Sequence, residues 1–321
     1  MAKTRTSPKK LILGADVGGT YIKTVLVDPR EHVLAVMKRS TLAPRGKDAL
    51  IERLILTLEE TAKKAGATMK DVAGVGVGFA GPLDPETGMV FNPPNLPGWS
   101  DVPLGDILRH RLKMPVSLDN DANMVALGEY WKGAGRGARC LVCLTLGTGV
   151  GGGIVLNGRV WHGVGGIAGE IGHMTLIRNG RRCACGNRGC LEAYASSQGL
   201  VQTMQDTLKK NRARRQDKLT PERIGKLARS GDKLAGRAIK DTGVMLGIAI
   251  GSLANVLNPD VVVIGGGVSK LGELLLDPVR DEARKRAFHK AVEGLKIVKA
   301  ELGDNAGALG AARSLMPSLN V

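Results

Sequence analysis

The chain has 321 residues, 43% of them hydrophobic and 24% charged, which suits two globular domains with a large buried core. No apolar run approaches the roughly 20 residues of a transmembrane helix, and the N-terminal apolar run is too short for a signal peptide. Five cysteines are too few for a disulfide framework. We therefore expect a cytoplasmic protein. The net charge of +16 would suit a nucleic acid, a membrane surface or a polyanionic substrate, but the basic run at 209–218 has no interleaved aromatics, and we interpret the charge as a basic solvated surface.

The first half of the chain alternates strand and helix patterns. A helix is predicted at 47–66, where apolar residues recur at helical spacing and Gly66 ends the pattern. Residues 83–99 are turn-rich and contain four prolines, so we expect a loop over a cleft. The other predictions for this half are strands at 11–15, 21–28 and 31–40, a strand that runs into a glycine-rich loop at 72–82, and a strand, sharp turn and helix at 115–131.

The second half begins with a pattern that resembles the start of the chain. Residues 141–158 and 11–28 share an apolar strand, a glycine-rich turn, a second apolar strand and a polar turn. Helices are predicted across 196–257, and a strand, glycine turn and helix at 260–288. The repeated plan predicts a duplicated α/β unit with a cleft between its halves.

Two glycine-rich turns are candidate phosphate sites. "GTGVGG" at 147–152 matches G-x-G-x-x-G, but a strand pattern follows it where a dinucleotide site needs a helix. "DVGGT" at 16–20 likewise precedes a strand and lacks the G-K-[ST] of a Walker A loop. Successive backbone N–H groups in such hairpins can hold phosphate oxygens, although the glycines could also serve only to permit tight turns. Thr20 and Thr148 would add hydroxyl donors, Lys23 would add charge unless strand alternation turns it away, and Asp16 is placed to hold a Mg²⁺ hydration shell.

The segment "LDNDAN" at 118–123 crowds polar side chains into a strand-to-helix turn. Helix capping explains one such residue, because Asp and Asn accept backbone N–H bonds at the N-cap. Four of them, Asp119, Asn120, Asp121 and Asn123, exceed that need. The functional interpretation is that Asp121 accepts a proton from a substrate hydroxyl, as in kinases, while Asn120 orients the substrate.

Three of the five cysteines lie together just downstream of His173. Cys183, Cys185 and Cys190 fall in a loop with glycines that free the backbone to fold around an ion. Three thiolates and one imidazole make a closed tetrahedral set that zinc favours in structural sites; free surface thiols or a local disulfide are the alternatives. Glu170 and Glu192 flank this segment. In contrast, Cys140 and Cys143 lie in a predicted strand on opposite faces and are interpreted as small apolar residues.

Taken in order, these motifs resemble one known family. "DVGGTYIK", "GFAGPLDPETGMV…NPPNLPGW", "DNDAN", "LGTGVGGGIVLNG", "AGEIGHM" and "CACGNRGCLEAY" are similar to the ROK family of sugar kinases and sugar-responsive repressors, and most similar to its bacterial-type glucokinases. The resemblance covers roughly residues 11–313. This chain has Asp119 where the family motif usually has Glu, a conservative change that we do not expect to alter the reaction.

The resemblance implies an actin-like, hexokinase-type α/β fold with two domains that close over a cleft, commonly in dimers or tetramers. We expect a small domain at 1–118, on which a C-terminal helix at about 307–321 packs back, and a large domain at 119–306 that contains the zinc loop. Asp121 corresponds to the catalytic base. The implied sugar contacts are Gly81, Asn95, Asn120, Asp121, Glu170, His173 and Glu192. The implied nucleotide contacts are Asp16, Gly18, Gly19, Thr20, Lys23, Gly147, Thr148, Gly149, Gly265 and Gly266.

The expected function is transfer of the γ-phosphoryl group of Mg-ATP to the 6-hydroxyl of glucose, with His173, Cys183, Cys185 and Cys190 holding structural zinc. Mannose, fructose or an N-acetylhexosamine as acceptor, and polyphosphate or ADP as donor, stay open. A sugar-responsive repressor needs an N-terminal helix-turn-helix domain, and only about ten residues precede the first predicted strand, so no nucleic-acid partner is expected. A structural actin-like ATPase would leave Asp121, the cysteines and Glu192 without roles.

Overall fold

The computed structural model describes residues 11–93, 96, 98–213 and 218–316. The chain divides into two compact units, each described by itself below. Unit 1 comprises the chain up to residue 131, the segment 162–167 and the chain from residue 304 onward. Unit 2 comprises residues 132–161 and 168–303. The domain boundary expected after residue 118 stays a prediction.

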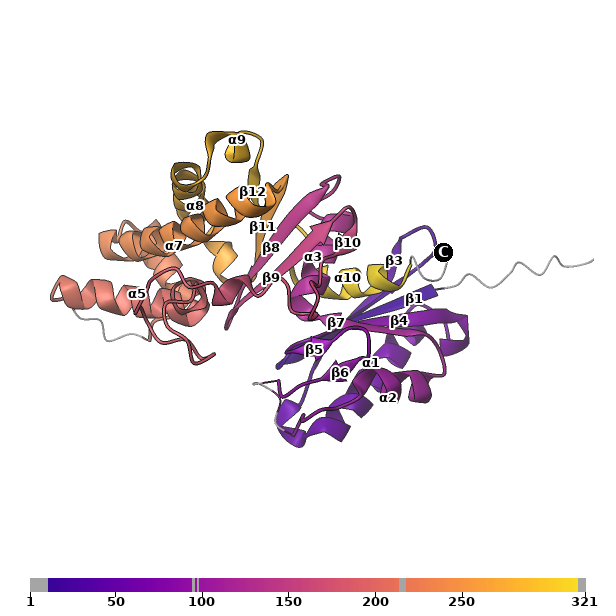
Figure 1. The fold of residues 1–321 in the computed structure, drawn as a ribbon. Coiled ribbons are helices and arrows are strands. Elements are labelled where there is room, and N and C mark those ends of the chain that lie inside the picture. The colour runs from indigo at the N-terminus through magenta and orange to yellow at the C-terminus, as the bar shows by residue number, and fades with distance from the viewer. Residues whose placement is uncertain (1–10, 94–95, 97, 214–217, 317–321) are drawn as a thin grey trace, which may run out of the picture. The chain divides into compact units, whose positions relative to one another are not determined.

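Unit 1 is built on a five-stranded sheet in the order β3-β2-β1-β4-β7. Strands β1 to β3 form an antiparallel meander, and β1, β4 and β7 run parallel. Both faces of the sheet are covered, by α1 and α2 on one side and by α3 and α10 on the other (Figure 1). The bounds are β1 Leu11–Val17, β2 Tyr21–Val27, β3 Val33–Ser40, β4 Val72–Phe79, β7 Val116–Asn120, α1 Lys47–Lys64, α2 Leu104–Leu112, α3 Asp121–Lys132 and α10 Ala306–Leu315.

Glycines in the central strands let α10 lie directly on the sheet. A Cβ added to Gly76 would fall 1.7 Å from the carbonyl oxygen of Ala311, and one added to Gly14 would fall 2.0 Å from that of Ala308. Such distances are far inside van der Waals contact, so only glycine fits at these strand positions. The close approach ties the last described helix to strands from the start of the chain.

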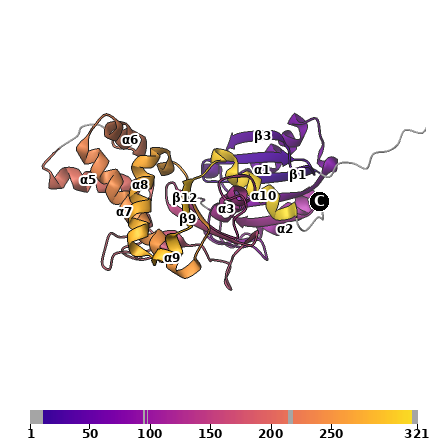
Figure 2. The same ribbon diagram turned by 90° about the horizontal axis from the view of Figure 1, so that it is seen from above.

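Unit 2 repeats the same strand plan in the order β10-β9-β8-β11-β12. An antiparallel meander of β8 to β10 is joined to parallel β11 and β12. The helices α5 to α8 pack together in this unit (Figure 2). The bounds are β8 Cys140–Leu146, β9 Val150–Leu156, β10 Arg159–Val160, β11 Val261–Gly265, β12 Lys296–Lys299, α4 Glu192–Ala195, α5 Ser197–Lys210, α6 Pro221–Arg229, α7 Lys233–Leu257, α8 Glu273–Arg286 and α9 His289–Val292.

The two sheets confirm the duplicated α/β plan, including the strand that follows "GTGVGG". The segment 83–99 was expected to be a loop, but it contains a short hairpin of β5 (Leu83–Asp84) and β6 (Met89–Val90). The sequence patterns also missed α2, α9 and β12. Among the helices of the described residues, none is both long and apolar enough to cross a membrane.

Candidate active site

The polar residues of unit 1 gather where parallel strands end. Asp16 of β1 is in register with Gly78 of β4, which is in register with Asp119 of β7. Because neighbouring strands lie about 4.8 Å apart, the backbones of the two aspartates are separated by roughly 10 Å. Asn120 ends β7 and Asp121 begins α3 directly. The carboxyl edge of this sheet therefore collects two of the predicted motifs from segments about 100 residues apart.

Asp16 is held between two neighbours. Lys23, its register partner on β2, places Nζ 3.4 Å from Oδ2 of Asp16. On the helix side, a Cβ added to Gly307 of α10 would lie 2.8 Å from Cγ of Asp16. Burial raises the pKa of Asp16 above its usual range, and Lys23 opposes that shift. Strand alternation thus does not turn Lys23 away from this edge.

The first glycine hairpin follows β1. The Gly18 N–H donates to the carbonyl oxygen of Tyr21 at 3.0 Å, which closes the turn. Gly19 and Thr20 are exposed. An added Cβ on Gly18 would meet only the Tyr21 carbonyl oxygen, at an ordinary 3.5 Å. The fold itself therefore does not require glycine at position 18.

Asn120 joins two predicted sugar-contact positions. Its Nδ2 donates to the carbonyl oxygen of Gly81 at 3.2 Å, and Gly81 has a φ of +126° that favours glycine. Oδ1 of Asn120 and Oδ1 of Asp121 both lie 2.9 Å from the Ala122 N–H, so the capping role of this motif is present as well. Asn95, predicted to contact sugar, lies outside the described residues.

Asp119 has a partner that the sequence did not reveal. Its Oδ2 lies 2.7 Å from Nε2 of His162, and its Oδ1 accepts from the Asn120 N–H at 2.7 Å and from Nδ2 of Asn123 at 2.9 Å. The hydrogen bond to Asp119 raises the pKa of His162. Asp119 is buried and both of its carboxylate oxygens accept hydrogen bonds, whereas Asp121 is partly exposed.

The second glycine hairpin lies at the carboxyl edge of the unit 2 sheet. The Gly147 N–H donates to the carbonyl oxygen of Gly149 at 2.9 Å, and Oε2 of Glu192 accepts from the Val150 N–H at 3.0 Å. A Cβ on Gly149 would lie 2.4 Å from that same Oε2. The hairpin and the carboxylate predicted to contact sugar are thus in direct contact. Thr148 is the exposed tip of the turn.

The predicted "GGG" turn after β11 packs against the end of β8. Gly266 has a φ of +85°, and an added Cβ would fall 2.4 Å from the carbonyl oxygen of Leu146. Because β8 and β11 are parallel neighbours, Gly265 and Gly266 lie beside the strand end from which Gly147 continues. The nucleotide positions predicted for unit 2 therefore share one edge of its sheet.

The structure brings the four predicted metal ligands together. The ligand atoms of His173, Cys183, Cys185 and Cys190 all lie within 4.8 Å of one another. The Sγ atoms of Cys185 and Cys190 are 3.8 Å apart, and Sγ of Cys183 is 3.7 Å from Nδ1 of His173. Zn–S and Zn–N bonds of about 2.3 and 2.0 Å in a tetrahedron place ligands roughly 3.5–3.8 Å apart. The donor set and its spacing fit zinc.

The two glutamates flank this cluster as expected. Oε2 of Glu170 is 3.8 Å from Nε2 of His173, the ring nitrogen that faces away from Cys183. The Cys183 thiol donates to Oε1 of Glu192 at 3.5 Å. Burial raises the pKa of Cys183 to about 12. Cys140 and Cys143 lie in β8, outside the cluster.

The ROK family pattern matches residues 12–317 of the chain. A glucokinase from Halalkalibacterium halodurans is 39% identical over 306 residues, which cover 93% of this chain and 92% of that protein. This chain belongs to the ROK family. A xylose repressor from Caldicellulosiruptor bescii is 35% identical over 93% of this chain, but over only 76% of its own length.

Among solved structures of this family, a glucokinase from Streptomyces griseus in complex with glucose and AMPPNP is 33% identical, with a TM-score of 0.75 over 94% of this chain and 98% of that one. The mixed α/β structure with two sheets is the actin-like fold of ROK sugar kinases. Fold class and family, both expected from the motifs, are confirmed.

Proposed function

We propose that this ROK protein is an ATP-dependent hexose kinase that transfers the γ-phosphoryl group to the 6-hydroxyl of glucose. The observation that carries the proposal is the carboxyl edge of the unit 1 sheet, which places Asp16 near the end of β1 and places Asn120 and Asp121 where β7 passes into α3. Phosphoryl transfer needs a positioned carboxylate for the acceptor hydroxyl and a separate phosphate site. The likeness to named glucokinases over nearly the whole chain supports glucose as the acceptor.

In this proposal Asp121 accepts the proton of the sugar 6-hydroxyl. It begins α3 and is partly exposed, whereas the neighbouring Asp119 is buried in its bonds to His162 and Asn123. Asn120 is fixed by its bond to the Gly81 carbonyl oxygen, and this bond orients its amide for a sugar hydroxyl. The remaining sugar contacts are proposed to be Asn95, Glu170, His173 and Glu192.

The glycine hairpins are proposed to hold the nucleotide phosphates. The Gly18 and Gly147 N–H groups close their own turns, so the phosphate donors are proposed to be the backbone N–H groups of Gly19 and Thr20 in the first hairpin and of Thr148 and Gly149 in the second. Asp16 would hold the hydration shell of a Mg²⁺ ion, and Mg²⁺, when bound with ATP, neutralises charge on the transferred phosphoryl group. Lys23, 3.4 Å from Asp16, balances this carboxylate.

Zinc is proposed as a structural ion held by His173, Cys183, Cys185 and Cys190. These four side chains would complete a tetrahedral zinc shell with no open position, so the ion would serve to fix the loop between Glu170 and Glu192. Elemental analysis of protein purified without chelator should find one zinc per chain.

Steady-state phosphorylation over a panel of sugars and donors tests the function. We expect glucose with ATP to give the highest kcat/KM, above mannose, fructose and N-acetylhexosamines, and above polyphosphate or ADP as donor. Absence of phosphoryl transfer with every pair would contradict the proposal.

A sugar-responsive repressor is the second candidate, because a xylose repressor is 35% identical over 93% of the chain. Salt-dependent binding to specific DNA, released by a sugar, would support that candidate instead.

A further inference from the structure

The segment that carries three of the proposed zinc ligands is a loop whose two ends lie together. We call residues 181–190 the metal loop. The chain enters it at Arg181 and leaves it at Cys190, from which Leu191 leads directly into α4 and Glu192. The Gly189 N–H donates to the carbonyl oxygen of Arg181 at 2.8 Å. The loop is thus closed at its base by backbone as well as by its ligand cluster.

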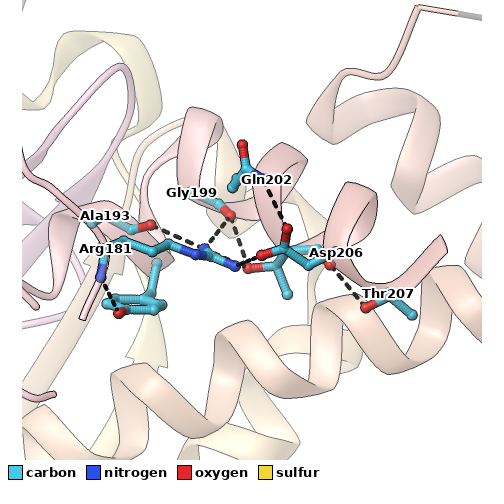
Figure 3. Close-up of polar contacts among 8 residues, drawn as sticks. Arg181, Ala193, Gly199, Gln202, Asp206 and Thr207 are labelled. Atoms are coloured by element: carbon cyan, nitrogen blue, oxygen red, sulfur yellow. Dashed lines mark hydrogen bonds and ion pairs between the residues drawn. The ribbon is translucent and has the colours of Figure 1, made fainter. Parts of the chain in front are cut away.

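The Arg181 side chain spans from the loop entry to the helices that follow the loop exit. Its Nη1 donates to the carbonyl oxygens of Ala193 at 3.1 Å and Gly199 at 3.2 Å, and its Nη2 lies 2.7 Å from Oδ2 of Asp206 (Figure 3). Nη1 also lies 3.0 Å from Oγ1 of Thr203. One guanidinium therefore joins the loop entry to α4 and to two turns of α5.

Arginine is well suited to joining the loop entry to α4 and α5. A helix leaves its last carbonyl groups without partners inside the helix, and α4 is only four residues long. The guanidinium presents several N–H donors in a fixed plane, so it can serve carbonyl oxygens and a carboxylate together. A lysine has a single nitrogen and can reach one of these groups well, but not all of them.

Tyr194 strengthens the closure from the helix side. Its hydroxyl accepts from the Arg181 N–H at 2.8 Å, and its ring lies under the guanidinium with 4.7 Å between Cζ and the ring centroid. A Cβ on Gly180 would lie 2.3 Å from the Tyr194 hydroxyl oxygen, and one on Gly189 would lie 1.8 Å from the Ile177 carbonyl oxygen. Glycine at position 180 thus admits the Tyr194 hydroxyl, and glycine at position 189 admits the Ile177 carbonyl oxygen.

We propose that Arg181 is a positioning residue that closes the metal loop before any metal binds and sets the position of Glu192 on α4. The four guanidinium contacts described above, to Ala193, Gly199, Thr203 and Asp206, involve no ligand atom of the cluster, so this part of the closure requires no bond to zinc. A loop that is already closed loses less conformational entropy when the ion binds. The same closure holds α4, whose Glu192 contacts the Val150 N–H of the second hairpin.

The test measures hydrogen exchange in the reduced, metal-free full chain, followed by competition for zinc against a chromophoric chelator. In wild-type protein, peptides covering 181–193 should remain protected after zinc removal. In Arg181→Ala they should exchange at least about tenfold faster, and zinc affinity should fall on the order of 10- to 100-fold. Arg182→Ala removes the same charge one residue further on and is the matched control, with wild-type protection and affinity.

Two further variants separate positioning from general loss of structure. Arg181→Lys keeps the charge near Asp206 and should recover only a small part of the protection, and it carries the test if Arg181→Ala does not fold. Asp206→Asn, which leaves the carbonyl contacts in place, should have a smaller effect. Unprotected loop peptides in metal-free wild-type protein, or equal exchange in wild type and Arg181→Ala, would overturn the proposal. The inference rests on the proposed zinc site but not on the proposed reaction, since the exchange measurement needs neither sugar nor ATP.

Discussion

The two sheet edges occupy the same place in a repeated strand plan, yet they position their polar residues by different means. In unit 1, Asn120 and Asp121 are carried directly by the end of β7 and the start of α3. In unit 2, Glu192 comes to its hairpin only at the end of an irregular segment that contains the metal loop. Changes in unit 1 should therefore alter the chemistry with the fold intact, whereas changes in unit 2 should alter position and stability together.

The largest effect is expected from Asp121→Asn. The amide keeps the shape and can still hydrogen-bond a hydroxyl, but it cannot accept the proton. We expect kcat to fall by roughly 10²–10⁴, with a much smaller change in the KM for hexose, because proton acceptance matters in the transition state. Steady-state kinetics on protein with an unchanged melting temperature provides the measurement.

Asp119→Asn is the control for that change. It lies two residues away, and its carboxylate bonds to His162 and Asn123 rather than standing at the helix start. We expect a modest loss of stability and a far smaller loss of kcat. A greater loss of kcat in Asp119→Asn than in Asp121→Asn would contradict the assignment of the base.

The second largest effect is expected in unit 2, when one of the proposed zinc ligands is removed. Cys185 is exposed, whereas Cys183 and Cys190 are buried, so Cys185→Ala deletes a ligand without leaving a hole in the core. We expect loss of zinc, a lower melting temperature and a KM for hexose raised about tenfold or more. Cys140→Ala, outside the cluster, should retain zinc. If Cys185→Ala keeps a full equivalent of zinc, the ligand set is wrong.

A smaller effect distinguishes the two glycine hairpins. Gly18→Val fits the fold, since its Cβ would meet only the Tyr21 carbonyl oxygen at 3.5 Å, but the side chain would obstruct an approaching phosphate. We expect ATP affinity to fall on the order of tenfold, about 1.4 kcal/mol, with hexose affinity kept. In contrast, Gly149→Ala would place its Cβ 2.4 Å from Oε2 of Glu192 and should weaken hexose binding as well. Isothermal titration of each ligand separates the two outcomes, and unchanged ATP affinity in Gly18→Val would place the phosphates elsewhere.

Sequence reasoning reached the parts of both sites that lie in short contiguous motifs. Each of these motifs, namely the hairpins, the "DNDAN" turn and the cysteine cluster, can be recognised within about ten residues of sequence. Turn chemistry and metal ligation require particular residue types close together. It did not reach contacts that depend on how distant segments pack. His162 and Asp119 are 43 residues apart, and Arg181, one of 46 basic residues, gains its role only from carbonyl groups of α4 and α5. Strand β12 was missed because it has only four residues, with lysine at both ends.

The smallest expected effect is on stability, and it concerns the pair of His162 and Asp119 in unit 1, which the sequence did not reveal. The bond to Asp119 raises the pKa of His162, and Glu86 contributes in the same direction. A folded-state pKa above the unfolded value of about 6.5 means that protonated His162 stabilises the fold fully below pH 6.5, and that this contribution disappears as the pH rises through the folded pKa. His162→Gln keeps an N–H donor for Asp119 but cannot titrate. The difference in unfolding free energy between wild type and His162→Gln should therefore be largest near pH 5.5–6 and shrink toward pH 9. It should stay within about 1 kcal/mol, because the His162 side chain is partly exposed. Chemical denaturation of both proteins across this pH range measures the difference in unfolding free energy. The contributions of the other titrating groups are common to both proteins and cancel in this difference. A gap that stays constant or widens with pH would show that the charge on His162 contributes nothing to holding the 162–167 segment on unit 1.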